Sequence, residues 1–283
     1  MLQIESCREI QALALKNRRS GRSIALVPTM GFLHEGHLEL MRRARQRTDL
    51  VIVSIFVNPI QFGPNEDLDS YPRDLEGDLK KCREVGVDLV FTPTPEELYP
   101  DNAFQTSVEV EKITRGLCGA GRPGHFKGVT TVVSKLFNLT LPDYAFFGEK
   151  DYQQLAVIRR MTADLNFPIE IVGVPIIREE DGLALSSRNA YLNEQERREA
   201  PAIHQALSRV AGLFHQGVSD SEKLVREAAD HIRQQITSPC EIEYIKICQA
   251  DDLEEINGEI TGPAVILTAV RLGRTRLIDN LQL

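Results

Sequence analysis

The chain lacks the features that mark nucleic-acid-binding, membrane and secreted proteins. Acidic residues outnumber basic ones, 41 to 33, and the formal net charge of -8 argues against binding to nucleic acid. No apolar run approaches the length of a membrane span, so no membrane association is expected. Charged residues interrupt the apolar pattern of residues 1–19, which we therefore do not expect to be a signal peptide.

Cysteine is sparse and has no recognisable spacing. The five cysteines are odd in number and form no Cys-x-x-Cys pair. Such thiols are typical of a reduced cytoplasmic protein, so a cytoplasmic location is expected. The sequence also lacks internal repeats and low-complexity segments. With 283 residues, of which 42% are hydrophobic, the chain is long enough for one or two ordinary globular domains.

What the sequence does contain is an alternation of apolar runs and amphipathic segments up to residue 177. The apolar runs are short and rich in β-branched residues, which is typical of buried parallel strands. Strands are predicted at residues 23–27, 50–57, 88–92, 106–110, 143–147 and 169–175. Helices are predicted at residues 6–19, 38–44, 73–85, 129–139 and 152–165, and Ser6-Cys7-Arg8-Glu9 is expected to form a capping box at the start of the first one. This order indicates an α/β fold with a Rossmann-like parallel sheet, whose ligand site lies at the carboxyl ends of the strands.

The pattern changes after the polar segment Arg178–Gly182. Helices are predicted at residues 194–216 and 219–235, followed by strands at 241–247, 264–270 and 275–278. Runs of helices followed by runs of strands indicate a small α+β domain. We therefore expect a Rossmann-like domain of residues 1–177, a hinge and phosphate-contacting loop of residues 178–189, and a C-terminal domain of residues 190–283.

The segment Pro28–His37 joins a predicted strand to a predicted helix and is the strongest candidate for a functional site. Gly31 and Gly36 let the backbone approach a ligand closely, and the unpaired N–H groups at a helix start favour negative charge. His34 and His37 add two imidazoles that can face the same ligand. The turn therefore predicts a phosphate site.

Two other interpretations of this histidine pair compete with phosphate binding. A zinc-binding helix of the His-Glu-x-x-His type needs histidines four residues apart, whereas His34 and His37 are three apart, and Gly36 disfavours a helix through both. Either histidine alone could cap the helix or lie in the core. The two together, directly after a strand, favour phosphate.

Four further segments are placed where they could contact the same ligand. The loop of residues 58–65 follows a strand and is expected beside the segment Pro28–His37, which we call the histidine turn. Lys150 follows another strand at a helix start, although an exposed turn lysine is the commoner case. The irregular stretch of residues 93–128 ends in a glycine-rich basic segment, Gly121–Gly128, which is either a mobile flap over an anionic ligand or an ordinary loop. Ser186-Ser187-Arg188 offers two hydroxyls and a guanidinium, but is weak evidence in isolation.

Taken together, five motifs resemble the pantothenate synthetase family within the HIGH-type nucleotidyltransferase superfamily. They are Pro28–His37, Phe56–Phe62, Arg122–Gly128, Gly148–Gln154 and Leu185–Asn189, and the resemblance extends over essentially the whole chain. The Lys-Met-Ser-Lys-Ser loop of the related aminoacyl-tRNA synthetases is absent, which argues against such a synthetase.

The resemblance implies an ATP-dependent ligation of (R)-pantoate to β-alanine through a pantoyl adenylate, with release of AMP and pyrophosphate. It also implies Mg²⁺, small-molecule substrates and a homodimer. Two alternatives stay open. One is a nucleotidyltransferase that acts on another small acceptor, and the other is a nucleotide-binding regulatory protein without turnover.

The resemblance further implies roles for individual residues. The ATP site would comprise Met30, Gly31, Phe32, Leu33, His34, Glu35, Gly36, His37, Gly148, Glu149, Lys150, Asp151, Ile177, Leu185, Ser186, Ser187 and Arg188. The catalytic residues would be His34, His37, Lys150 and Arg188, with a proton-donor role for His37. Phe32 stands where a smaller or polar residue is expected.

The acid and amine substrates would be bound by amides. Gln61 and Gln154 would hold pantoate, and Gln61 would also contact β-alanine, because an amide can donate and accept at once. Asp78 is a weak candidate for a metal contact, since an aspartate on a helix is usually solvated.

Overall fold

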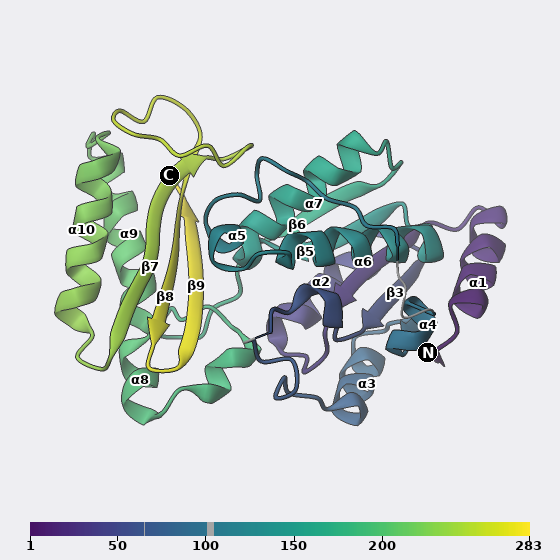
Figure 1. Cartoon of the computed structure of the whole chain (residues 1–283). Coiled ribbons are helices and arrows are strands. Elements are labelled where there is room, and N and C mark those ends of the chain that lie inside the picture. Colours follow the sequence, from purple (N-terminus) through teal and green to yellow (C-terminus); the bar gives the residue numbers. More distant parts are fainter. Residues whose placement is uncertain (65, 101–104) are drawn as a thin grey trace. The chain divides into compact units, whose positions relative to one another are not determined.

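The computed structural model describes residues 1–64, 66–100 and 105–283. Asn65, the last residue of the predicted 58–65 loop, and residues 101–104 of the predicted irregular stretch lie outside the described residues. The chain divides into two compact units (Figure 1). Unit 1 comprises Met1–Glu149 and Val157–Pro175, and unit 2 comprises Lys150–Ala156 and Ile176–Leu283. The predicted domain ranges stay a prediction, but the grouping shows that a short segment near residue 150 packs with the C-terminal part of the chain.

Unit 1 is built on a six-stranded parallel sheet with the strand order β1-β4-β3-β2-β5-β6. The strands are β1 (Leu2–Ile4), β2 (Ile24–Thr29), β3 (Leu50–Ile55), β4 (Leu89–Phe91), β5 (Tyr144–Gly148) and β6 (Glu170–Val174). From β2 the chain runs outward through β3 and β4 on one side, and β5 and β6 lie on the other side. The strand order therefore reverses between β2 and β5, and such switch points are where α/β sheets bind ligands.

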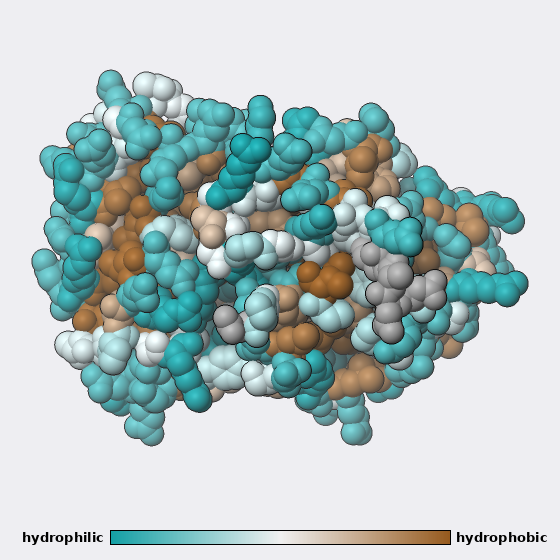
Figure 2. Space-filling view, viewed as in Figure 1, coloured by the Kyte–Doolittle hydropathy of each residue, from teal (hydrophilic) through white to brown (hydrophobic). Residues whose placement is uncertain are grey.

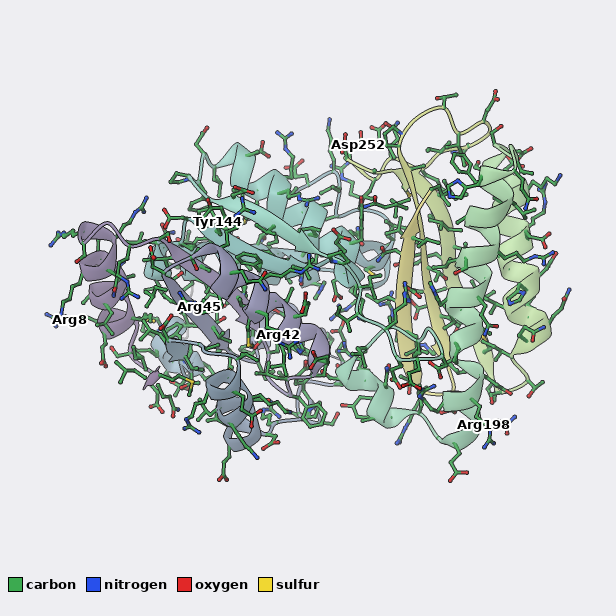
Figure 3. All side chains as sticks on the ribbon, turned by 180° about the vertical axis from the view of Figure 1, so that it is seen from behind. Arg8, Arg42, Arg45, Tyr144, Arg198 and Asp252 are labelled. Atoms are coloured by element: carbon green, nitrogen blue, oxygen red, sulfur yellow. The ribbon has the colours of Figure 1, made fainter. Side chains whose placement is uncertain are left out.

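Helices cover both faces of this sheet (Figure 1). The helices of this part of the chain are α1 (Cys7–Arg19), α2 (Glu35–Arg47), α3 (Leu75–Glu84), α4 (Pro95–Leu98), α5 (Cys118–Gly121), α6 (His125–Thr140) and α7 (Tyr152–Asp164), and α1, α2 and α6 contact β2. Side chains alternate along β2, so that Ala25 and Val27 join a core cluster with Leu40 and Met41 of α2. On α1, Ile10 is fully buried, whereas the charged Arg8 points away from the unit (Figure 3).

Unit 2 has an antiparallel sheet in the order β7-β8-β9. Its strands are β7 (Cys240–Gln249), β8 (Ala264–Leu272) and β9 (Thr275–Gln282), and its helices are α8 (Glu194–Glu199), α9 (Pro201–His215) and α10 (Ser221–Gln235). Apolar residues of α9, α10 and the sheet form one buried cluster that includes Leu207, Leu224 and Ile266. The predicted fold class, a Rossmann-like parallel sheet with a smaller C-terminal α+β part, is confirmed.

The predictions for individual elements were wrong at four places. The strand β1 was missed because only three residues form it. The strand predicted at 106–110 does not form, since Val108 N donates to Thr131 Oγ1 (3.0 Å) and Val108 O accepts from Thr130 Oγ1 (2.6 Å) on α6 instead of pairing with a strand. The helix predicted at 194–216 is broken, because Pro201, which has no N–H, starts a new helix.

The fourth error concerns the start of α1. Ser6 occupies the predicted N-cap position, but its side chain makes no capping hydrogen bond. The N–H of Cys7 instead donates to Glu97 Oε1, 2.6 Å away, so a side chain from 90 residues along the chain satisfies this helix start.

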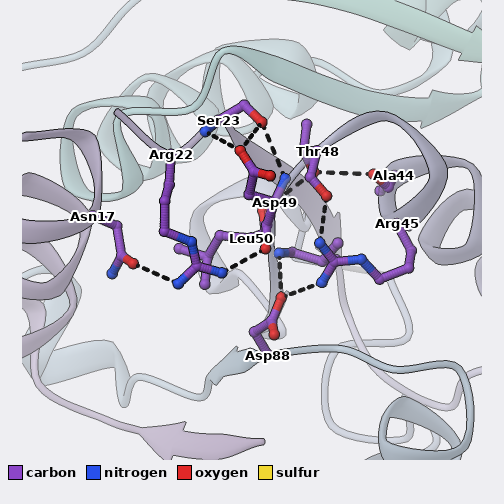
Figure 4. A network of polar contacts seen from close by, with 10 residues as sticks. Asn17, Arg22, Ser23, Ala44, Arg45, Thr48, Asp49, Leu50 and Asp88 are labelled. Carbon is purple, nitrogen blue, oxygen red and sulfur yellow. Dashed lines mark hydrogen bonds and ion pairs between the residues drawn. The ribbon is translucent and has the colours of Figure 1, made fainter. Parts of the chain in front are cut away.

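A polar network closes the amino ends of β2, β3 and β4 (Figure 4). Asp49 Oδ2 accepts hydrogen bonds from the backbone N–H and the hydroxyl of Ser23, at 2.9 and 2.8 Å, and these bonds hold the pKa of Asp49 below its ordinary value. Asp88 Oδ2 accepts from Val51 N at 2.8 Å and pairs with Arg45. Side chains thus satisfy backbone N–H groups at the amino edge of the sheet. The opposite, carboxyl edge is the one at which such sheets bind ligands.

Hydrophilic residues cover most of the face seen in Figure 2. Among the described residues, the large apolar side chains that stay exposed are Met1, Leu2, Leu15, Ile60, Leu75 and Leu165. Single exposed apolar side chains are ordinary and by themselves indicate no binding surface. In the part of the chain that the structure describes, no helix has the length and apolar character needed to cross a membrane.

Gly128 provides a test of the packing between α6 and the short 3-10 helix η1 (Pro59–Gln61). A Cβ atom at Gly128 would lie 2.4 Å from Ile60 O and 2.6 Å from Gln61 Cα. Gly128→Ala is expected to lower the free energy of unfolding by about 1–3 kcal/mol, because the backbones must separate. Chemical unfolding followed by circular dichroism measures the difference.

Gly212, in the interior of α9, is the matched control. A Cβ atom there would meet no atom within 4 Å, so Gly212→Ala is expected to raise the free energy of unfolding by about 0.5–1 kcal/mol. Wild-type stability in Gly128→Ala would show that α6 and η1 are not in close contact.

Candidate functional site

The histidine turn leaves β2 through two consecutive residues in the left-handed conformation, Gly31 at φ 83° and Phe32 at φ 50°. Such a backbone points successive N–H groups to the same side and forms a concave anion site. A Cβ atom on Gly31 would lie 3.0 Å from Asp78 Oδ2 and 3.1 Å from Ile55 Cγ2, so glycine is favoured by space as well as by φ. Phe32, the unexpected residue at the sequence level, is held in a conformation that side chains rarely adopt.

Asp78 of α3 fills this concavity. Its Oδ2 accepts from Phe32 N and its Oδ1 from Leu33 N, both at 2.7 Å, and the residue is 1% exposed. Burial raises the pKa of Asp78, although the two N–H groups and the nearby Lys81 favour the carboxylate. The competing interpretation of Asp78 as an ordinary solvated aspartate is therefore wrong. Its predicted metal contact stays untested, while the structure gives it the role of fixing the turn.

The two histidines organise the start of α2. His34 is the N-cap residue, and its Nδ1 accepts from Gly36 N at 3.2 Å. His37 Nδ1 accepts from His34 N at 3.3 Å, and the two ring centroids are 4.1 Å apart. Because Nδ1 is an acceptor in both rings, the neutral rings carry their proton on Nε2. Each imidazole thus presents an N–H donor while capping the helix. The capping interpretation therefore holds for His34 without opposing phosphate binding.

The loop after β3 lies beside this turn, as predicted. Gln61 Nε2 lies 3.2 Å from the sulfur of Met30, which is a weak acceptor, so the amide keeps donor capacity for a ligand. Asn58 holds Gln61 in place: its Nδ2 donates to Gln61 Oε1 (3.0 Å) and to Gly128 O (3.1 Å), and Tyr99 OH donates to its Oδ1 (2.8 Å). Asn58, 1% exposed, is a supporting residue that the sequence analysis did not single out.

The last four residues of the basic segment Gly121–Gly128 belong to α6, which begins at His125. Arg122 Nε donates to Glu66 Oε1 at 2.7 Å, and its Nη1 lies 3.0 Å from His125 Nε2. His125 Nδ1 lies 2.9 Å from Gln61 O, so this ring donates from Nδ1 and accepts at Nε2. Burial opposes ionisation of Glu66, but the hydrogen bonds and charge of Arg122 outweigh it and lower the pKa of Glu66. Whether the segment moves as a flap stays a prediction.

Unit 2 carries the other predicted nucleotide contacts. Lys150, in the short 3-10 helix η2 (Glu149–Asp151), has its side chain 20% exposed and its Nζ 3.7 Å from Asp151 Oδ2. Ile177 and Leu185 are brought together, because Leu185 N donates to Ile177 O at 3.0 Å. Ser186 caps the 3-10 helix η3 (Ser187–Tyr191) through a hydrogen bond from Arg188 N at 3.3 Å.

The predicted residues thus divide between the units. Unit 1 holds Met30 to His37, Gln61, Asp78, Gly148 and Glu149, and unit 2 holds Lys150, Asp151, Gln154, Ile177 and Leu185 to Arg188. Gln154 is half-buried in the first turn of α7. Among the described residues, no group of three or more His, Cys, Asp or Glu side chains is arranged to hold a metal ion.

A charge cluster around the buried Asp279 lies near Ser186 in unit 2. Arg178 forms a bidentate pair with Asp279, at 2.7 and 2.8 Å. His204 Nδ1 lies 3.7 Å from Asp279 Oδ2, which is too far for a hydrogen bond. Burial and the charge of Arg178 lower the pKa of His204 from 6.5, against the attraction of Asp279. His204 is therefore held in its neutral form.

Asp78→Asn tests whether the two hydrogen bonds to the Asp78 carboxylate fix the histidine turn. Asparagine keeps the shape but replaces one acceptor oxygen with an NH₂ group, which leaves a backbone N–H without a partner. The free energy of unfolding is expected to fall by about 1–3 kcal/mol, and the amides of Phe32 and Leu33 are expected to exchange faster with solvent. Hydrogen exchange read by mass spectrometry measures the protection.

Asp74→Asn is the control on the same helix, since Asp74 is the N-cap of α3 and accepts from Gly77 N at 3.0 Å. Asparagine caps as well as aspartate, so little change is expected. Equal effects of the two substitutions would contradict a specific role for Asp78.

The depressed pKa of His204 predicts a pH dependence of stability. Because the unfolded chain binds the proton more readily, the stabilisation is complete above pH 6.5 and is lost as the pH falls through 6.5 toward the folded pKa. His204→Gln is expected to flatten this decline, as measured by chemical unfolding at about pH 8 and about pH 5.5, on either side of the ordinary histidine pKa. His215→Gln, at an exposed position in α9, serves as control and should keep the wild-type slope.

Comparison with known proteins gives one consistent result. The chain matches the family model described as pantoate-beta-alanine ligase over residues 3–282. It is 55% identical to the pantothenate synthetase of Syntrophotalea carbinolica over 271 residues, covering 96% of this chain and 94% of that protein. It is 52% identical to the enzyme of that name from Pelotomaculum thermopropionicum, covering 99% and 98%.

Solved structures agree. The crystal structure of pantothenate synthetase from Thermus thermophilus matches with a TM-score of 0.92 at 45% identity, covering 99% of both chains. The pantoate-beta-alanine ligase of Francisella tularensis, complexed with beta-gamma ATP and beta-alanine, matches with a TM-score of 0.79 at 32% identity, covering 99% of this chain and 97% of that one. The chain therefore belongs to the pantoate-beta-alanine ligase family.

Proposed function

We propose that this chain condenses (R)-pantoate with β-alanine at the expense of ATP, through a pantoyl adenylate. Family membership supports the reaction, and one structural observation supports the location of the site. The turn that bears His34 and His37 follows β2 at the point where β2 and β5 lie side by side and the strand order reverses.

The reaction has two balanced steps. The pantoate carboxylate attacks the α-phosphorus of ATP and pyrophosphate leaves; the β-alanine amine then attacks the acyl carbon, AMP leaves, and the new amide nitrogen loses a proton. A carboxylate has no good leaving group until it is adenylated. The protein must therefore align two anions and stabilise the charge that builds on the phosphates.

The histidine turn would bind the phosphates as a set of neutral donors. His34 and His37 each carry the proton on Nε2, because Nδ1 accepts a backbone N–H. A neutral imidazole with this proton donates a hydrogen bond readily and gives up the proton poorly. We therefore assign His37 the stabilisation of phosphate charge rather than the proton-donor role that the family resemblance implies.

Cations would complete the nucleotide site. Lys150 and Arg188 are proposed to stabilise the charge that develops during adenylation, because an ammonium and a guanidinium can both pair with phosphate oxygens. The remaining ATP contacts are proposed at Met30, Gly31, Phe32, Leu33, Glu35, Gly36, Gly148, Glu149, Asp151, Ile177, Leu185, Ser186 and Ser187.

Amides are proposed to select the acid substrate. Gln61 has an Nε2 donor whose contact in unit 1 is a thioether, and Gln154 is half-buried on α7. We assign pantoate to Gln61 and Gln154, and β-alanine to Gln61. Neutral amides suit a hydroxy acid, whereas a phosphorylated acceptor would need additional cations.

Mg²⁺ is proposed to accompany ATP and to neutralise its phosphate charge. Both oxygens of Asp78 already accept backbone N–H groups, so this carboxylate fits a structural role better than that of a principal metal ligand. Binding through phosphate oxygens and water agrees with the preferences of Mg²⁺. We also propose a homodimer in the cytoplasm, a location supported by five free cysteines.

The proposed function predicts a defined set of products. Purified protein with ATP, Mg²⁺, pantoate and β-alanine is expected to release AMP and pyrophosphate in equal amounts, and pantothenate should form with them. Without β-alanine, labelled pyrophosphate should exchange into ATP only when pantoate is present. Chromatography of nucleotides and an exchange assay measure both outcomes.

His37→Ala is the variant that is expected to lose activity in the same exchange assay. If Nε2 stabilises transition-state charge, pyrophosphate exchange should fall at least about a hundredfold. Release of ADP by the wild type would refute the proposed reaction, because ADP forms when the γ-phosphoryl group is transferred and not when the α-phosphorus is attacked. Exchange that does not need pantoate would also refute it and would favour a nucleotidyltransferase with another acceptor.

A further inference from the structure

Strand β9 carries two consecutive buried polar residues, Asp279 and Asn280, which are 5% and 4% exposed. Their backbones pair with Thr268 and Leu267 of β8, so ordinary sheet pairing fixes their positions. Buried polar side chains are costly unless they are hydrogen-bonded, and both are. Their partners lie on two loops far earlier in the chain, around Lys150 and Arg178.

Asn280 holds the first of these loops. Its Nδ2 donates to the backbone carbonyl of Lys150, 3.0 Å away. The bond is made by the main chain of the residue proposed to act on the phosphates, so it fixes the origin of the Lys150 side chain. Loss of the donor would leave this carbonyl without that partner and free the turn to shift.

Asp279 holds the second loop. Both of its oxygens bind Arg178, and Arg178 Nη1 also donates to Gly182 O at 3.1 Å. Arg178 pairs through its backbone with Ala184, and Asn189 Nδ2 donates to Ala184 O at 3.1 Å. Residues 178–184 thus form a short hairpin, closed by the pairing of Arg178 with Ala184. Through this hairpin, the segment Ser186 to Arg188 is anchored to the Asp279 carboxylate.

The two anchors are joined and tightly packed. The backbone N–H of Asn280 donates to Asp279 Oδ1 at 2.8 Å, so the Asp279 carboxylate is bound to the main chain that carries the Asn280 side chain. On the hairpin, a Cβ atom at Gly182 would lie 2.9 Å from Cδ2 of His204, and Gly182 has φ 94°. The hairpin thus has little room to move against α9.

We infer that Asp279 and Asn280 are positioning residues that hold the Lys150 turn and the Ser186–Arg188 loop in a fixed relation on one strand. The inference rests on the proposed function, because it requires both segments to act on the same phosphates. Adenylation depends on the placement of these cations, and a shift of about 1 Å can cost a hundredfold in rate. The attack of β-alanine on a finished adenylate does not need them to the same degree.

Asn280→Asp and Asn280→Ala test the inference in the full-length protein. Both remove the donor to Lys150 O, and the first keeps the side-chain shape. Pantoate-dependent pyrophosphate exchange is expected to fall by about tenfold to a hundredfold in kcat per titrated active site. The KM for β-alanine, and the single-turnover rate at which β-alanine consumes adenylate that has already formed, should stay within about twofold of the wild-type values. Asp279→Asn should lower exchange in the same way, since it weakens the bidentate pair.

Gln282→Ala, at an exposed position on the same strand, is the control and should exchange at the wild-type rate. A purely structural role would lower the thermal midpoint and the number of active sites while kcat per site stayed normal, and that result would overturn the inference. Equal losses in both half-reactions would also overturn it.

Pyrophosphate exchange by the wild-type protein distinguishes a failure of the proposed reaction from a failure of the proposed positioning role. If wild-type protein shows no pantoate-dependent exchange, the proposed reaction fails, and ATP affinity measured by calorimetry then decides the positioning role. An unchanged ATP affinity in both Asn280 variants would overturn it, and a loss of about tenfold or more would support it.

Discussion

The bond between the Asp78 carboxylate and the N–H groups of Phe32 and Leu33 is the constraint on which the histidine turn depends. Two left-handed residues in succession create a concavity for an anion, and the protein fills it with its own side chain. With the turn fixed, His34 can cap α2 and His37 can bond to His34. The ring donors of unit 1 are thus positioned by a carboxylate that need not touch a substrate.

The two edges of the parallel sheet have different roles for a physical reason. At the amino edge, side chains of Asp49 and Asp88 satisfy the backbone donors at the strand starts. At the carboxyl edge, the strand order reverses between β2 and β5, and open α/β sheets bind ligands at such a point. Side-chain hydrogen bonds thus close the amino edge, and the candidate site follows the carboxyl edge.

Local patterns were sufficient to predict five of the six strands of the parallel sheet and the histidine turn, but neither the three-residue strand β1 nor the side chains that support the turn. The apolar, β-branched run of β3 and the glycine spacing after β2 can each be recognised from a few neighbouring residues. Asp78 acts on a turn 46 residues earlier, and Asn280 on a carbonyl 130 residues earlier, so only the folded chain reveals them. One signal was present: Asp78 lies one helical turn before the buried Cys82, on the inner face of α3.

The opposite proton positions of the histidines in unit 1 have a consequence for the helix start. In His34 and His37 the Nδ1 atom accepts a backbone N–H, whereas in His125 it donates to a carbonyl. A second proton on His125 would disturb its contact with Arg122, but on His34 or His37 it would set one donor against another and remove a side-chain cap from α2. The capping of this helix end is therefore coupled to the protonation state of the two rings.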